Sequence, residues 1–184
     1  MTTEGGVSSL RGDGAAEGIA RLNNLPRAEA EAELLKCCGS SRWAREVASR
    51  RPFRGAEELL GAAEEVWRSL GESDWLEAFS RHPKIGERKA AAGQTERERA
   101  WSAAEQSGMD AAGERVREEL AEGNREYERR FGHIFIVCAA GKTPAEMLAL
   151  LRSRLANEPA DELRVAAGEQ QRITRLRLRK LLGA

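Results

Sequence analysis

Apolar residues recur every three or four positions through most of this chain, and no other feature constrains its fold as strongly. The segment 56–70 is the clearest case, because its Leu, Ala, Val and Trp residues form one helical stripe that ends before Gly71. Similar segments, separated by Gly, Pro and Ser, continue to Leu182. The sequence therefore predicts an all-α fold, a single-domain irregular bundle of about eight helices.

Short local signals indicate where several of these helices begin and end. Pro26 predicts the start of a helix that runs to about residue 38, and Gly39 is expected to end it. Thr143-Pro144-Ala145-Glu146 is a capping sequence with proline at the first helical position, and it opens a helix to about residue 156. The last helix is expected over about 159–182.

Two regions do not follow the helical period. Residues 1–18 are rich in Gly, Ser and Thr with few large apolar residues, and this composition predicts a disordered N-terminal tail. Residues 19–184 are then expected to form the helical domain. The apolar run 135–138 could be a strand or a buried turn by periodicity alone. Because no partner strand is evident, we interpret it as a buried connector or a helix start.

The charge balance limits the classes of partner. The 30 Lys and Arg residues equal the 30 Asp and Glu residues, so the formal net charge is zero. A nucleic-acid binder would show a net basic field, and capture on an anionic membrane would need one too. No apolar run approaches the ~20 residues of a membrane helix. We therefore expect a protein that binds neither nucleic acid nor membrane.

The three cysteines and two histidines carry little sign of a metal or a disulfide. Cys37 and Cys38 are adjacent and Cys138 makes the total odd, which does not suit a disulfide framework and favours a cytoplasmic location. No CxxC pair, HExxH sequence or glycine-rich phosphate loop occurs. The sequence thus predicts no bound metal.

A histidine and a polar triad are the residues that suggest chemistry. His82 precedes Pro83 at the end of an expected helix, and histidine exchanges protons near neutral pH. Ser102, Glu105 and Gln106 stand at positions i, i+3 and i+4, which places them on one helical face. The alternatives are ordinary: a histidine that binds free carbonyls at a helix end, and a solvated helix face.

Arg177 interrupts the apolar stripe of the last expected helix, since it lies four residues from both Ile173 and Leu181. An inward-facing arginine needs an anion or an acceptor, either an internal carboxylate or a substrate carboxylate or imide. Arg175 and Arg179 fall on other faces and are expected to be exposed. His133 is interpreted as structural.

Many short segments resemble one family, the 2-oxo-4-hydroxy-4-carboxy-5-ureidoimidazoline (OHCU) decarboxylases of the urate-to-allantoin pathway. The resemblance covers nearly everything after the tail, in order and in spacing. It rests on the following segments: Leu22-Asn23, 43–48, 51–53, Ala78-Phe79, 82–86, 102–108, Asn124 with Tyr127, Phe131-Gly132, 135–139, Arg154-Leu155 and 173–178.

The resemblance implies a cofactor-free carboxy-lyase that converts OHCU to (S)-allantoin and is usually a homodimer. It also implies residue roles, with His82 and Glu105 as catalytic residues. The residues that would contact the substrate are Pro83, Ser102, Gln106, Phe135, Ile136, Val137, Cys138, Ala139 and Arg177. Two other classes remain open: a hydrolase acting on a related ureido or imidazoline compound, and a binding or scaffold protein that kept the fold.

Overall fold

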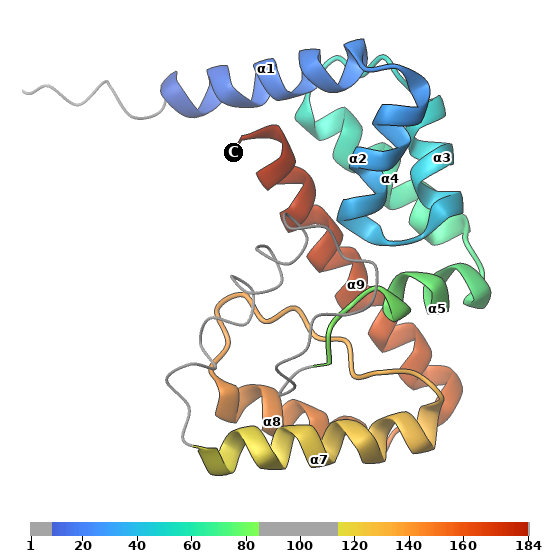
Figure 1. The fold of residues 1–184 in the computed structure, drawn as a ribbon, viewed down its shortest axis with the longest axis vertical. Helices are drawn as coiled ribbons and strands as arrows, with labels where there is room; N and C mark the ends of the chain where they lie inside the picture. The colour runs from blue at the N-terminus through green and yellow to red at the C-terminus, as the bar shows by residue number, and fades with distance from the viewer. Residues whose placement is uncertain (1–8, 85–113, 184) are drawn as a thin grey trace, which may run out of the picture. The chain divides into compact units, whose positions relative to one another are not determined.

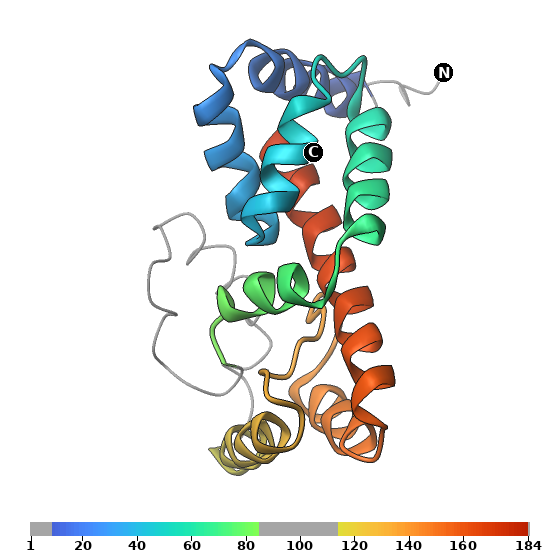
Figure 2. The same cartoon turned by 90° about the vertical axis from the view of Figure 1, so that its right-hand side faces the viewer.

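The computed structural model describes residues 9–84 and 114–183, and every regular element in these residues is an α-helix. The prediction of an all-α fold is confirmed, with eight helices in the described part of the chain. These residues form two compact units (Figures 1 and 2). Unit 1 holds the described residues up to Asp74 and those from Thr174 onward, and unit 2 holds the described residues between Trp75 and Ile173. The sequence did not indicate this division.

Four complete helices and the end of a fifth build unit 1. The helices are α1 (Ser9–Asn24), α2 (Arg27–Cys38), α3 (Ser41–Ser49), α4 (Ala56–Ser69) and the C-terminal part of α9 (Pro159–Leu182).

The boundary between α2 and α3 agrees with its sequence signals. Gly39 ends α2 in the left-handed conformation (φ 92°), which only glycine adopts without steric cost. The next residue, Ser40, caps α3, because its hydroxyl accepts a hydrogen bond from the backbone N–H of Trp43 at 3.2 Å. Trp43 is fully buried, and its indole N–H donates to the carbonyl of Ala63 in α4 at 2.9 Å.

The predicted disordered tail is wrong from Ser9 onward, because α1 begins there and runs through the expected boundary at residue 18. Tertiary contacts explain the difference. Ile19 and Leu22 are buried, and Gly18 approaches the backbone of Leu182 so closely that a Cβ at residue 18 would lie 2.4 Å from the Leu182 carbonyl oxygen. Composition reflects only the local conformational preference of the residues, whereas tertiary packing stabilises the helix here.

Unit 2 contains most of α5 (Glu72–Ser80), all of α7 (Glu114–Phe131) and α8 (Pro144–Arg154), and α9 up to Ile173. The predicted capping box at Thr143 is present: its hydroxyl accepts from Glu146 N–H at 3.2 Å, and the Glu146 carboxylate accepts from Thr143 N–H at 2.7 Å. The Thr143 backbone N–H and its hydroxyl both donate to the Glu146 carboxylate, and they hold the pKa of Glu146 below its usual value.

The core of unit 2 lies between α7, α8 and the segment that joins them. Gly123 of α7 makes this packing close, because a Cβ there would lie 2.5 Å from a methyl carbon of Leu151 in α8. Side chains from all three parts form one buried cluster, and its members are Leu120, Tyr127, Phe135, Val137, Ala139, Met147, Leu148 and Leu151.

Within the described residues, no helix is long and apolar enough to cross a membrane. The helix predicted to carry Ser102, Glu105 and Gln106 lies outside the described residues.

Candidate active site

His82 lies in the turn that follows α5. Its backbone N–H donates to the carbonyl of Phe79 at 3.1 Å, and its side chain is partly buried. The ring of Phe79 contacts the ring of His133, with 5.2 Å between the centroids. This contact connects the end of α5 with the segment that follows α7. His82 and the segment 135–139 both belong to unit 2.

The polar triad Ser102, Glu105 and Gln106 lies outside the described residues, as do Ile85 and Gly86. The roles expected of these residues therefore stay predictions. Pro83 follows His82 directly and is partly buried.

The segment 135–139 is neither helix nor strand, and all five residues are buried. This result confirms the interpretation of the apolar run as a buried connector. A buried, irregular backbone must find partners for its peptide groups, because an unpaired buried N–H or C=O is costly. The partners that the segment does find come from α8, α9 and the following loop.

The first partner is Arg154, near the end of α8, whose Nη1 donates to the carbonyl of Ile136 at 2.8 Å. Its guanidinium also lies over the ring of Phe135, 4.6 Å from the centroid. Arg154 is itself held by Glu162 of α9, whose carboxylate accepts from the Arg154 Nε at 2.7 Å. The side chains are 8% and 0% exposed, so this is a buried ion pair.

Two further side chains complete the hydrogen bonding of Glu162. Asn157 Nδ2 donates to its second oxygen at 2.7 Å, and the Tyr127 hydroxyl donates to the first. Burial raises the pKa of Tyr127 well above its usual value, so this hydroxyl stays protonated and serves as a donor. The carboxylate is therefore satisfied on both oxygens, which a buried charge requires.

The second partner of the segment is Glu169, also on α9. Its carboxylate accepts a hydrogen bond from the backbone N–H of Cys138 at 2.7 Å. The carbonyl of Cys138 also has a partner, because it accepts a hydrogen bond from Lys142 Nζ at 2.8 Å. Charged side chains thus bind the peptide groups of Ile136 and Cys138, the residues on either side of Val137.

Arg177 belongs to the part of α9 in unit 1, and only 4% of it is exposed. The prediction that it faces inward is confirmed. Its neighbours Arg175 and Arg179 are exposed, also as expected, and each lies 3.9 Å from a carboxylate oxygen of Glu57.

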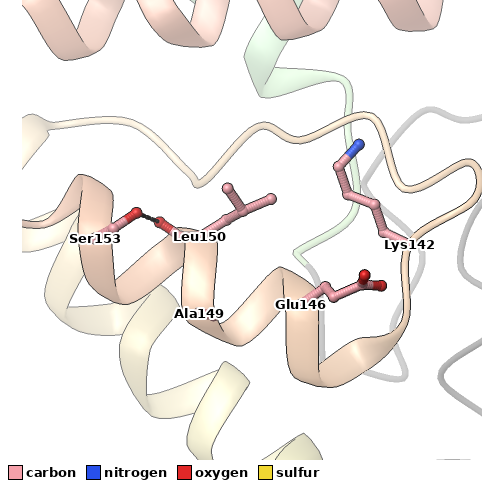
Figure 3. A pocket seen from close by; sticks show the side chains of 5 residues that line it. All are labelled: Lys142, Glu146, Ala149, Leu150 and Ser153. Carbon is pink, nitrogen blue, oxygen red and sulfur yellow. Dashed lines mark hydrogen bonds between the residues drawn. The ribbon is translucent and has the colours of Figure 1, made fainter.

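A hollow of about 430 Å³ lies over α8, lined by Lys142, Glu146, Ala149, Leu150 and Ser153 (Figure 3). None of the predicted site residues lines it, so we do not assign the active site to it. In the described part of the chain, no group of three His, Cys, Asp or Glu residues is placed to hold a metal ion.

Sequence reasoning missed Arg154, Glu162 and Glu169 as residues of the site region. All three are Arg or Glu residues of helices, and such residues are usually solvated. The only sequence signal that includes Arg154 is the family resemblance, through the segment Arg154-Leu155.

The chain matches the family model described as OHCU decarboxylase over residues 23–179. It is 39% identical over 152 residues to the uric acid degradation bifunctional protein TTL of Arabidopsis thaliana, covering 82% of this chain but 47% of that protein. It is also 32% identical over 142 residues to the mouse 2-oxo-4-hydroxy-4-carboxy-5-ureidoimidazoline decarboxylase, covering 75% of this chain and 77% of the relative.

Two solved structures have the same fold. A crystal structure of OHCU decarboxylase in the presence of (S)-allantoin superposes with a TM-score of 0.71 at 40% identity, covering 83% of this chain and 98% of that one. A crystal structure of (S)-allantoin synthase gives a TM-score of 0.62 at 19% identity, covering 89% of this chain and 53% of that one. The second likeness shows the fold alone.

Proposed function

The chain belongs to the OHCU decarboxylase family, and we propose that it decarboxylates OHCU to (S)-allantoin in urate degradation. The observation that carries this proposal is the family match over residues 23–179, which includes His82, the buried segment 135–139 and Arg177. The chain spans about half the length of the bifunctional plant relative, so a second activity of that protein is not carried over.

The reaction suits a protein that supplies only polar side chains and backbone. The bond between the ring carbon and the carboxylate breaks, carbon dioxide leaves, and the electron pair passes into the adjacent C=N bond of the ring. The substrate therefore supplies the electron sink that many decarboxylases take from a cofactor. The ring nitrogen that receives the electrons takes up a proton. The hydroxyl on the decarboxylated carbon then loses its proton and becomes a carbonyl, while a proton delivered to the ureido-bearing carbon from one face gives the S product. The protein must orient the ring, stabilise the developing charge and direct that proton.

His82 and Glu105 are proposed to act together on the substrate hydroxyl and on proton transfer. Histidine suits this role because its unperturbed pKa lies near neutrality, and a carboxylate can orient it or stabilise its charged form. The position of His82 supports the proposal: the turn after α5 is tied to the helix by the 3.1 Å bond to Phe79.

The remaining proposed roles concern binding. Gln106 and Arg177 would hold the ring and ureido groups, since an amide both donates and accepts and a guanidinium offers a fork of donors. Ser102 and Pro83 would line the site. The segment 135–139 would bind the ring through its backbone, and its burial supports this role because peptide hydrogen bonds are strongest away from water.

The proposal extends to the assembly and its compartment. We propose a homodimer, as the family resemblance implies, and a cytoplasmic location, which three buried thiols at Cys37, Cys38 and Cys138 would suit. Light scattering of the purified protein would test the first, with a monomer mass at micromolar concentration contradicting it.

The experiment for the activity generates OHCU in place from urate, using a urate oxidase and a hydroxyisourate hydrolase, and follows circular dichroism. Spontaneous decay gives racemic allantoin, so only an enzyme gives a rapid and lasting signal of the S isomer. We expect that signal with this protein, together with one carbon dioxide released per substrate. His82→Asn should abolish it while the far-UV spectrum and thermal midpoint stay those of the wild type.

A flat trace from folded wild-type protein would reject the decarboxylase proposal. Consumption of substrate without carbon dioxide would point instead to hydrolysis. A fully active His82→Asn variant would leave the reaction standing but remove His82 from it. Arg175→Ala is the control substitution, because this side chain is exposed and should leave turnover unchanged.

A further inference from the structure

Two hydrogen bonds fix the orientation of both peptide groups of Val137. The peptide between residues 136 and 137 has its carbonyl bound to Arg154, at 2.8 Å. The peptide between residues 137 and 138 has its N–H bound to Glu169, at 2.7 Å. The only cis peptide in the described residues precedes Pro52, so both of these units are trans and planar.

In a trans peptide the C=O and the N–H point in opposite directions. The N–H of Val137 therefore points away from Arg154, and the C=O of Val137 points away from Glu169. Within the described part of the chain, neither of these two backbone groups has a hydrogen-bond partner. Val137 is only 5% exposed, and unpaired backbone groups at such burial are rare. A donor and an acceptor on one buried residue are thus held ready for a ligand.

We propose that Glu169 is a positioning residue, which acts by holding the Val137 carbonyl toward the substrate while Arg154 holds the Val137 N–H. This inference rests on the proposed function, because it names the part of that site which recognises the ring. The matching ligand group is a cyclic amide edge, an N–H beside a C=O, and OHCU and allantoin both carry one. Two hydrogen bonds to one residue would fix both the plane of the ring and its position along the segment.

Glu169 suits a test better than Arg154. Its side chain is 12% exposed, whereas Arg154 takes part in a buried ion pair whose loss would disturb the fold. Its other contact is an ion pair with Arg172, an exposed residue one turn further along α9. Removal of Arg172 therefore separates the surface ion pair from the bond to Cys138.

The experiment compares Glu169→Ala, Glu169→Asp, Glu169→Gln and Arg172→Ala in steady-state decarboxylation, with binding of (S)-allantoin by calorimetry as a second readout. In the Ala variant we expect KM and the allantoin Kd to rise about tenfold, the loss of one buried hydrogen bond, with a smaller change in kcat. Gln keeps an oxygen that can accept from Cys138, so it should restore most of the binding. Asp keeps the charge with a shorter reach, so it should behave like Ala.

Arg172→Ala should be wild-type in both readouts. The proposal is overturned if the Ala and Asp variants bind allantoin as the wild type does, or if kcat falls while KM and Kd stay unchanged. It is also overturned if Gln is no better than Ala, since a lost charge would then explain the effect. Should Ala fail to fold, the Asp and Gln pair carries the same comparison. A wild-type protein without decarboxylase activity would instead reject the proposed function, which the assay reports before any variant is made.

Discussion

Arg154 and Glu162 form an ion pair inside unit 2, with 2.7 Å between the Arg154 Nε and the Glu162 carboxylate. The pair joins the end of α8 to the first turns of α9, and its guanidinium binds the carbonyl of Ile136. A buried pair of charges contributes little net stability by itself, since desolvation offsets the attraction, but loss of one partner leaves a buried charge uncompensated. The effect of the pair on stability is therefore clearest when one of the two charges is removed.

Glu162→Gln should destabilise the protein strongly. The amide keeps the size of the side chain but leaves the Arg154 charge unpaired, and such losses cost about 3–5 kcal/mol. Asp161→Asn is the matched control, because Asp161 and its partner Arg164 are 70% and 69% exposed and exposed pairs contribute at most about 1 kcal/mol. Urea unfolding of both variants gives the free energies. Equal losses in the two would contradict a buried pair.

Arg177→Ala tests the proposed binding role of this arginine. If Arg177 contacts the substrate, KM should rise by about tenfold or more, because a charged hydrogen bond contributes about 1.5–3 kcal/mol. Arg175→Ala and Arg179→Ala are the controls on the same helix, since both side chains are exposed. We expect these two to retain wild-type kinetics. A wild-type KM in folded Arg177→Ala would make the residue structural.

Helix boundaries were predictable where one residue type has a local physical reason to occupy them. Gly39 adopts a positive φ, Ser40 accepts from the third residue of its helix, and Thr143 pairs with Glu146. Such signals act within four residues. α1 has no comparable local signal, and the backbone that Gly18 approaches belongs to Leu182, near the other end of the chain.

The candidate site was predictable in part for a similar reason. An apolar run such as 135–138 indicates burial whatever its conformation, and an arginine on an apolar stripe such as Arg177 indicates an inward face; both are buried. The side chains that fix the buried segment could not be predicted. The Glu169 carboxylate binds the backbone N–H of Cys138, which lies 31 positions earlier in the sequence. From sequence alone, a glutamate in a helix rich in charged residues is expected to be exposed to solvent.

A pair of glycine substitutions should separate close packing from helix propensity. In Gly18→Ala the new Cβ would meet the Leu182 carbonyl at 2.4 Å, and overpacking of this kind costs about 1–3 kcal/mol. In Gly61→Ala the new Cβ would meet nothing within 4 Å, inside α4. We expect this variant to gain about 0.5–1 kcal/mol, because alanine loses less backbone entropy in a helix. Thermal unfolding of both variants shows whether each substitution raises or lowers the free energy of unfolding. A stabilised Gly18→Ala variant would contradict the close contact with Leu182.

His133 should make the stability of the protein depend on pH in the acidic range. It is 7% exposed, its Nδ1 lies 3.0 Å from the Ile134 carbonyl, and its Nε2 has no hydrogen-bond partner among the described residues. Nδ1 is thus the donor of a neutral ring, and a second proton on Nε2 would be buried without an acceptor. Burial accordingly lowers the pKa of His133 below the ordinary value of 6.5.

The sign follows from proton counting. Between the folded pKa and 6.5 the unfolded chain binds the extra proton and the folded chain does not, so the unfolding free energy rises with pH in this window. The stabilisation from neutral His133 is full above about pH 6.5 and is lost as the pH falls through the folded pKa. His133→Phe fits the aromatic contacts with Phe79, Tyr127 and Phe131 and cannot titrate. Urea unfolding from pH 7.5 to pH 5 should therefore show a steeper loss in the wild type and in His82→Asn than in His133→Phe. Parallel curves for all three proteins would show that His133 does not titrate differently on folding.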